Sequence, residues 1–206
     1  MSRKKSPISL PIDNCDRPLK FIDDLRRIFK ITADEERTIR EQLTYKLYPK
    51  GYVIDGPNEI LQNRFYIING VARTYYIYKG REFNYSFSFN DQFVLPPLTV
   101  HGKGEKIFIQ FLTDTELCHI TPRAAARENL PLLDTREFQS FVNLALIEQL
   151  KYMEEVTYML RLEAADRYRW VLEKYPQILE AVSLTQLASF LNITKETLYR
   201  IRSGKY

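Results

Sequence analysis

The chain has 206 residues, of which 45% are hydrophobic and 27% charged, an ordinary composition for a soluble globular protein of one large or two modest domains. No apolar run approaches the roughly 20 residues that span a bilayer, and the basic start lacks the apolar segment of a secretion signal, so we expect a cytoplasmic protein without membrane contact. The formal net charge of +4 permits nucleic-acid binding without establishing it.

Two short helices are predicted near the start of the chain, after an N-terminal arm at 1–20. Apolar residues recur at helical spacing over 21–29, which indicates the first helix. Thr32 and Glu35 then form a capping box, in which each side chain can bond the backbone amide of the other residue. The second helix is therefore expected to cover about 33–43.

Residues 45–120 have the pattern of an antiparallel β-domain, because short runs rich in Tyr, Phe, Ile and Val alternate with Gly, Asn and Pro. Asn69-Gly70 is a strong signal for a two-residue hairpin, and Lys79-Gly80 is a weaker one. Many short strands with closely spaced turns are typical of a barrel or a sandwich. The predicted strands are 52–54, 65–68, 71–78, 83–89, 107–112 and 116–120.

One of these strands has a wholly aromatic face. Phe83, Tyr85, Phe87 and Phe89 alternate along it, and alternate residues of a strand point to the same side. If that side faces the interior of a barrel, the rings either fill the interior or line an apolar pocket for a small effector.

A long helix is predicted over 136–160, after a shorter helix that starts at Thr121-Pro122. The long helix carries two apolar stripes and therefore needs two partners. One stripe can pack on the β-domain, and the other can pair with a second copy of the helix; a fully buried helix in a monomer is the alternative. The expected dimer interface consists of Leu146, Leu150, Met153, Thr157 and Leu160. The other stripe consists of Phe138, Val142, Ala145, Tyr152, Val156 and Met159.

The last segment has the pattern of a helix-turn-helix. Ser183 and Gln186 form a second capping box, and Ala188 is small, as the close crossing of two helices requires. Asn192 tolerates the left-handed conformation needed in the turn. Thr194 is suited to cap the helix that follows.

The helix after Thr194 presents a polar and basic face. Arg200 can bind O6 and N7 of guanine in a fork, Glu196 can accept from N4 of cytosine, and Lys195 can read guanine or neutralise a phosphate. Residues 183–206 contain four basic side chains against Glu196 alone. A capped helical hairpin with a solvated basic face is the alternative interpretation. The expected DNA-binding residues are Thr194, Lys195, Glu196, Thr197, Tyr199, Arg200 and Arg202.

Four segments are similar, in chain order, to segments of one known family. The sequence Thr-Lys-Glu-Thr-Leu-Tyr-Arg-Ile at 194–201 is similar to a recognition helix of pattern Ser/Thr-Arg/Pro-Glu-Thr-x-x-Arg, and 187–193 is similar to the helix and turn before it. Residues 164–168 resemble the segment after a dimerisation helix, and 49–73 resemble the first strands of a cyclic-nucleotide-binding barrel. The chain thus resembles the CRP/FNR transcription regulators over about 21–206.

The resemblance implies an α+β chain in which an antiparallel jelly-roll barrel with flanking helices precedes an all-α helix-turn-helix domain. It implies an N-terminal arm at 1–20, a cyclic-nucleotide-binding-like sensor domain at 21–135, a dimerisation helix at 136–162 and a DNA-binding domain at 163–206. It also implies a homodimer on palindromic double-stranded DNA, with half-sites about one helical turn apart. RNA polymerase and a small-molecule effector are further candidate partners.

Two features depart from the family pattern. The phosphate-binding cassette of cyclic AMP binders is missing after Phe93, where Pro96 and Pro97 remove backbone donors that a cyclic phosphate needs. We therefore expect an effector other than cyclic AMP. The family's β-hairpin wing follows the recognition helix, whereas this sequence stops at Tyr206, so we expect a domain without a wing.

Cysteine and histidine are scarce, which disfavours an enzyme. Cys15 and Cys118 are expected to be reduced thiols, and two cysteines do not supply the roughly four thiolates of an iron–sulfur cluster. Two histidines, His101 and His119, are too few for a metal-dependent barrel enzyme. We expect no catalytic residues, no metal and no cofactor. The alternative function is a dimeric ligand-binding or scaffold protein that does not bind DNA specifically.

Overall fold

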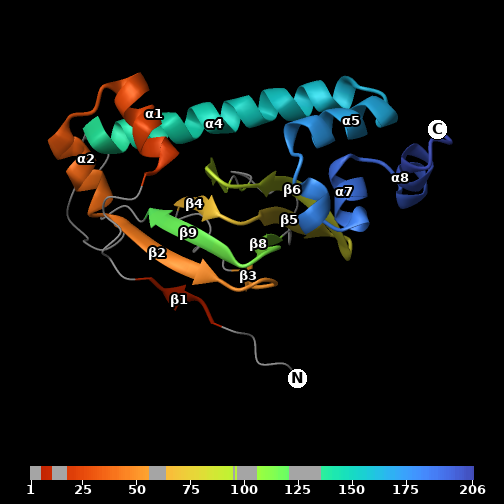
Figure 1. The fold of residues 1–206 in the computed structure, drawn as a ribbon, viewed down its shortest axis with the longest axis horizontal. Coiled ribbons are helices and arrows are strands. Elements are labelled where there is room, and N and C mark those ends of the chain that lie inside the picture. The colour runs from red at the N-terminus through yellow and green to blue at the C-terminus, as the bar shows by residue number, and fades with distance from the viewer. Residues whose placement is uncertain (1–5, 11–17, 56–63, 95, 97–105, 121–135) are drawn as a thin grey trace.

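The computed structural model describes residues 6–10, 18–55, 64–94, 96, 106–120 and 136–206. They form an α+β fold in which a β-sandwich lies beside one long helix, with two short helices at one end and the C-terminal helices at the other (Figure 1). None of the described helices is both long and apolar enough to cross a membrane.

The two N-terminal helices, α1 (Lys20–Phe29) and α2 (Ala33–Arg40), bury their apolar sides against the sandwich and the long helix. The capping box of α2 is confirmed, because the Glu35 amide donates to the Thr32 hydroxyl at 3.2 Å and the Thr32 amide donates to the Glu35 carboxylate at 2.6 Å. Helix α2 is shorter than predicted, since Leu43 already belongs to a strand.

The described strands are antiparallel and form two sheets, with the strand orders β1-β2-β9-β4-β7 and β3-β8-β5-β6. Alternating residues of strands such as β8 are buried between the sheets, where they form one apolar core. The antiparallel β-domain is thus confirmed, whereas closure into a barrel remains a prediction. The strands are β1 (Ile8–Ser9), β2 (Leu43–Tyr48), β3 (Val53–Ile54), β4 (Arg64–Asn69), β5 (Ala72–Tyr78), β6 (Arg81–Ser88), β7 (Gln92–Phe93), β8 (Lys106–Phe111) and β9 (Thr115–Ile120).

The two predicted hairpin turns have different outcomes. Lys79 and Gly80 have positive φ angles of 48° and 74° and join the paired strands β5 and β6, so this hairpin is confirmed. The hairpin predicted at Asn69-Gly70 is wrong, because β4 and β5 belong to different sheets. Gly70 has a φ of 120°, and a Cβ at this position would lie 2.5 Å from the hydroxyl oxygen of Thr115. Glycine is therefore needed where the chain crosses between the sheets.

The long predicted helix is confirmed as α4 (Arg136–Arg161), whose 26 residues give a length of about 40 Å. It runs from α1 and α2 at one end of the molecule to the C-terminal helices at the other (Figure 1). The predicted helix start at Thr121-Pro122 lies outside the described residues. The remaining helices of the described residues are α5 (Ala164–Lys174), α6 (Ile178–Ala181), α7 (Leu184–Phe190) and α8 (Lys195–Arg202).

Candidate nucleic-acid interface

Helices α7 and α8 form a helix-turn-helix around a small apolar core. Its core is almost fully buried: Leu187 and Ala188 of α7 and the C-cap Leu191 are at most 2% exposed, and Leu198 of α8 is 1% exposed. The Ile193 amide donates to the Ala188 carbonyl at 3.0 Å across the turn. A helix of eight residues is not stable on its own, so α8 depends on these contacts with α7.

The sequence signals for the start of α7 and for the turn are confirmed. The Gln186 amide donates to the Ser183 hydroxyl at 3.3 Å, and the Ser183 amide donates to the Gln186 side chain at 3.0 Å. Asn192 adopts a φ of 52°, the left-handed conformation that asparagine tolerates better than most residues. The chain therefore reverses sharply before α8.

Both ends of α8 are held by local hydrogen bonds. The Thr197 amide donates to the hydroxyl oxygen of Thr194 at 3.1 Å, so Thr194 is the N-cap. At the other end, the Lys205 amide donates to the Arg200 carbonyl at 2.9 Å and the Gly204 amide to the Ile201 carbonyl at 3.1 Å, with a φ of 68° at Gly204. This pair of bonds is a Schellman motif, which satisfies the last carbonyls of a helix.

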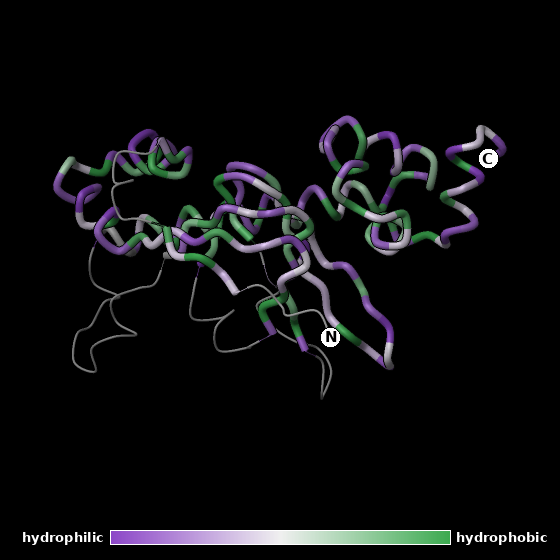
Figure 2. The backbone as a smooth tube through the Cα atoms, turned by 60° about the horizontal axis from the view of Figure 1, so that its bottom comes forward, coloured by the Kyte–Doolittle hydropathy of each residue, from purple (hydrophilic) through white to green (hydrophobic). Residues whose placement is uncertain are grey.

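The seven predicted DNA-binding residues come together on α8 and its N-cap. Thr197 is half-buried, while the other six side chains are exposed. Helix α7 lies between the sandwich and α8 (Figure 1), and the chain near its C-terminus is largely hydrophilic (Figure 2). The polar face of α8 is thus open to solvent.

The positive charges of Lys195, Arg200 and Arg202 on this face are not neutralised by any described ion pair. The guanidinium of Arg200 lies 5.7 Å from the centroid of the Tyr206 ring, a contact that leaves it exposed. An exposed cationic helix face of this kind can contact phosphates and the edges of bases.

Arg167 is a structural residue of this region that sequence reasoning missed. Its guanidinium donates to the carbonyl of Leu191 at 2.5 Å and to the carbonyl of Leu162 at 3.1 Å. Leu191 ends α7 and Leu162 follows α4, so one side chain joins the long helix to the turn of the helix-turn-helix. No local spacing rule could have identified this role, because its acceptors are backbone carbonyls.

The predicted dimer stripe is exposed along α4. Leu146 is 47% exposed, Leu150 60%, Met153 53% and Leu160 47%, and Thr157 is exposed as well. Of the second predicted stripe, Tyr152 and Met159 are buried, whereas Val142, Ala145 and Val156 are half-buried. The side chain of Phe138 lies outside the described residues. A fully buried α4 is therefore contradicted, and the described residues of the chain leave a large apolar stripe exposed.

The predicted aromatic face of β6 is divided. A β-bulge shifts the register, so that Thr74 pairs with Ser86 whereas Tyr75 pairs with Asn84. The intervening Tyr85 has no partner on β5, and the side-chain alternation changes there. We therefore find two aromatic groups, on β6 and at Phe89 just after it, instead of one continuous face.

The two groups have different surroundings. Phe87 packs edge-on against Phe190 of α7 with 5.1 Å between ring centroids, and Phe89 stacks on Tyr175 at 5.0 Å. Phe83 and Tyr85 instead line a groove of about 410 Å³ between the β5–β6 hairpin, α4 and α7. Phe87 and Phe89 thus contact the C-terminal helices, and none of the four belongs to the apolar core between the sheets.

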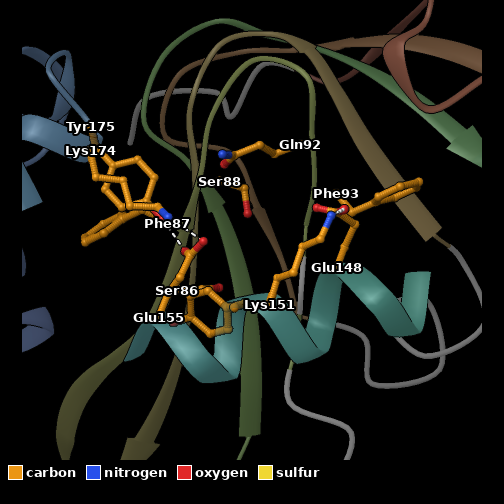
Figure 3. A pocket seen from close by; sticks show the side chains of 11 residues that line it. Ser86, Phe87, Ser88, Gln92, Phe93, Glu148, Lys151, Glu155, Lys174 and Tyr175 are labelled. Carbon is orange, nitrogen blue, oxygen red and sulfur yellow. Dashed lines mark hydrogen bonds and ion pairs between the residues drawn. The ribbon is translucent and has the colours of Figure 1, made fainter. Parts of the chain in front are cut away.

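A smaller pocket of about 140 Å³ lies between β6, β7, α4 and α5 (Figure 3). Its charged groups are already paired: Lys174 with Glu155, and Lys151 with Glu148 at 2.8 Å. The Tyr175 hydroxyl also donates to Glu155, at 3.4 Å. The polar wall of this pocket therefore serves to join α4 to α5.

The buried His119 and Cys118 are poor candidates for catalysis or metal binding. Burial lowers the pKa of His119 to about 4, with a further contribution from Lys46, and its Nε2 lies 2.9 Å from the Tyr48 hydroxyl. Cys118 is a free, buried thiol whose pKa is raised by burial. Within the described residues, no group of three or more His, Cys, Asp or Glu side chains could hold a metal ion. Cys15 and His101 lie outside the described residues.

Comparison with known proteins identifies the fold. No family model matches the chain, and no curated protein matches its sequence. Solved structures with the same fold include a transcriptional regulator of the crp/fnr family from Eubacterium rectale, with a TM-score of 0.59 and 16% identity over 85% of this chain and 84% of that one.

Two further structures extend this likeness. FixK2 from Bradyrhizobium japonicum has a TM-score of 0.54 and 18% identity over 79% of this chain and 83% of its own. A cyclic nucleotide-binding domain containing protein from Listeria monocytogenes has a TM-score of 0.56 and 13% identity over 90% and 88%. At these identities the likeness is one of fold, and it agrees with the resemblance seen in the sequence.

Proposed function

We propose that the chain is a sequence-specific DNA-binding transcription regulator of the CRP/FNR type. The observation that carries this proposal is the capped helix α8, whose polar and basic face is exposed on a helix-turn-helix. A fold shared with a crp/fnr regulator supports it. Residues 21–135 would be the sensor domain, 136–162 the dimerisation helix and 163–206 the DNA-binding domain.

Each residue of the exposed face has a distinct expected contact. Arg200 would bind guanine in the major groove, Glu196 would accept from cytosine, and Lys195 would contact guanine or a phosphate. The hydroxyl oxygen of Thr194 already accepts the Thr197 amide, so phosphate binding at this end would rely on the free first-turn amides of α8. Thr197, Tyr199 and Arg202 would complete the contact surface.

The active form would be a homodimer that pairs two copies of α4. The exposed stripe of Leu146, Leu150, Met153, Thr157 and Leu160 recurs at helical spacing along one side of the helix. Burying it against its own copy would remove a large apolar surface from water. A twofold axis through this contact would present two copies of α8 to a palindromic site.

The groove beside the β5–β6 hairpin is the best candidate site for a small effector. Its described lining residues include Phe83, Tyr85 and Tyr76 but no charged side chain. A volume of about 410 Å³ suits a small molecule, and an uncharged aromatic wall favours a neutral one over a cyclic phosphate. Met153 and Thr157 line the groove and also belong to the dimer stripe, so a second copy would border this site.

Selection of binding sites from random duplex DNA tests the proposal. We expect the full chain to recover a palindrome whose half-sites are separated by about one helical turn. Recovery of no consensus, with only weak and salt-sensitive binding, would favour the alternative of a dimeric ligand-binding or scaffold protein.

The variant Arg200→Ala identifies the residue that reads a base. We expect it to lose about 1–3 kcal/mol of binding free energy and to relax one position of each half-site, because a bidentate contact to guanine is removed. Arg37→Ala is the matched control, since it removes one exposed positive charge from α2, far from α8. An unchanged consensus in the Arg200→Ala selection would contradict the assigned role.

A further inference from the structure

Asn84 of strand β6 is hydrogen-bonded to the first helix of the helix-turn-helix. The backbone amide of Asn84 donates to the hydroxyl oxygen of Ser189 at 3.2 Å. The side-chain amide of Asn84 donates to the carbonyl of Gln186 at 3.1 Å. Both acceptors lie three residues apart on α7 and hence on one side of that helix.

The side chain of Asn84 is held in this orientation by Arg73. The guanidinium of Arg73 donates to the Asn84 side-chain oxygen at 2.9 Å, to Gln110 at 2.7 Å and to Glu82 at 2.7 Å. Arg73 is 4% exposed, and its guanidinium lies 4.0 Å from the centroid of the Tyr75 ring. Because the amide oxygen is bound on this side, the amide nitrogen is directed at α7.

The β-bulge explains why Asn84 can reach α7. Strand β6 is the edge of its sheet, and an edge strand has backbone donors that no neighbouring strand uses. The extra residue, Tyr85, bends the strand at this edge. Tyr85 is itself fixed to α4, because its carbonyl accepts the Tyr152 hydroxyl and its hydroxyl accepts the Gln149 side chain at 3.2 Å. The residues around Asn84 thus connect α4, β6 and α7.

The contact orients the DNA-binding helices without covering them. Asn84 and Phe87 touch α7 at Ser189, Gln186 and Phe190, whereas α8 lies beyond α7 on the far side (Figure 1). The polar face of α8 stays exposed, so this contact does not block its access to DNA.

We propose that Asn84 is a positioning residue, which sets the orientation of the helix-turn-helix relative to α4 and thereby aligns the two copies of α8 with two half-sites. This inference rests on the proposed DNA-binding function. Without the Asn84 side chain, α7 loses one of the bonds that hold it against β6, while Arg167 still joins the turn to the end of α4. Contacts between one α8 and one half-site stay the same, whereas simultaneous binding of two half-sites loses its pre-arranged geometry.

The variant Asn84→Ala tests whether Asn84 holds α7. This variant keeps the backbone amide of residue 84, whose hydrogen exchange reports directly on the bond to Ser189. Loss of the side-chain bond to α7 should accelerate exchange of this amide by about fivefold, since a hydrogen bond contributes roughly 1 kcal/mol. Glu82→Gln is the matched control, because Glu82 lies on β6 like Asn84 and also accepts a hydrogen bond from Arg73. This variant should leave the exchange rate of the Asn84 amide unchanged.

DNA affinity then tests the positioning role. With the operator recovered by selection, Asn84→Ala should weaken binding to the full palindrome by about tenfold and leave binding to an isolated half-site as in the unaltered chain. Equal losses on both DNAs would indicate general destabilisation and overturn the inference, as would an unchanged or increased affinity for the palindrome. If the unaltered chain binds no specific DNA, the proposed function fails, and the exchange rate of residue 84 still decides whether Asn84 holds α7.

Discussion

Some side chains of this molecule make hydrogen bonds to residues close in sequence, and others bond residues that are distant in sequence. Thr194 and Ser183 cap the helices that follow them, and their partners lie three residues away. Arg167 and Asn84 bond backbone or side-chain groups that are distant in sequence. The first kind can be recognised from spacing, because the geometry of a helix start is the same in every protein. The second kind depends on which elements the fold brings together.

His119 makes the stability of the sandwich depend on pH. Burial lowers its pKa from 6.5 to about 4, so the folded protein keeps the imidazole neutral in a range where the unfolded chain binds a proton. The stability that His119 contributes is therefore complete above about pH 6.5 and is lost as the pH falls towards 4. We expect a loss on the order of 2 kcal/mol from this residue across that interval.

Urea denaturation at pH 7.5 and pH 4.5 measures this effect. His119→Gln cannot take up a proton but retains a polar group that can bond the Tyr48 hydroxyl, so its stability should fall less over the same interval. The comparison separates His119 from carboxylates such as Glu36, which titrate alike in both proteins. Equal losses in both proteins would show that His119 is not responsible.

At the scale of elements, α4 has one side that the chain covers and one that it leaves in water. Phe141, Leu144, Tyr152 and Met159 are buried against the rest of the chain, while the stripe that includes Leu150 is not. Two apolar stripes on one helix were visible in the sequence. Only the structure shows which one the chain itself covers, because that depends on how the sandwich and the N-terminal helices pack against α4.

Leu150 lies in the middle of the exposed stripe and is 60% exposed. In the proposed homodimer, Leu150→Glu would place a carboxylate from each copy in the apolar contact, which is strongly unfavourable. We expect this variant to be a folded monomer at concentrations where the unaltered chain is a dimer. Light scattering after size-exclusion chromatography measures the molecular mass.

Leu150→Met is the matched control, since it keeps an apolar side chain of similar volume and should stay dimeric. A dimeric Leu150→Glu variant, or an unaltered chain that is monomeric at all concentrations, would rule out pairing through this stripe.

At the scale of the whole molecule, the sandwich, α4 and the helix-turn-helix meet around one groove. Tyr85 and Asn84 of β6, Met153 of α4 and Ser189 of α7 all line it. A molecule bound there would touch each part at once, including the residues that hold α7. This arrangement supplies a direct route by which an effector could change the orientation of α8, because its binding energy would differ between orientations.

We expect no cyclic AMP binding by this chain. The described lining of the groove carries no charged side chain, and a cyclic phosphate needs an arginine fork or several backbone donors. Isothermal titration calorimetry of cyclic AMP into the ligand-free protein should give no heat beyond dilution. A dissociation constant in the nanomolar or low-micromolar range would contradict this expectation.

The amino-acid sequence by itself determined the elements whose signals are local. The caps at Thr32, Ser183 and Thr194, the left-handed turn at Asn192 and the length of α4 all follow from residues within a few positions of one another. The seven candidate DNA-binding residues were predicted together for the same reason, since they share one capped helix and its N-cap.

The tertiary structure alone decided where distant segments meet. It separated β4 from β5 at Gly70, divided the aromatic residues of β6 at the bulge, and placed Asn84 and Arg167 against their distant acceptors. Strand pairing and register join residues far apart in the chain, and a shift by one residue turns every following side chain to the other face. Such a choice follows from the packing of the whole molecule, which no short window of sequence contains.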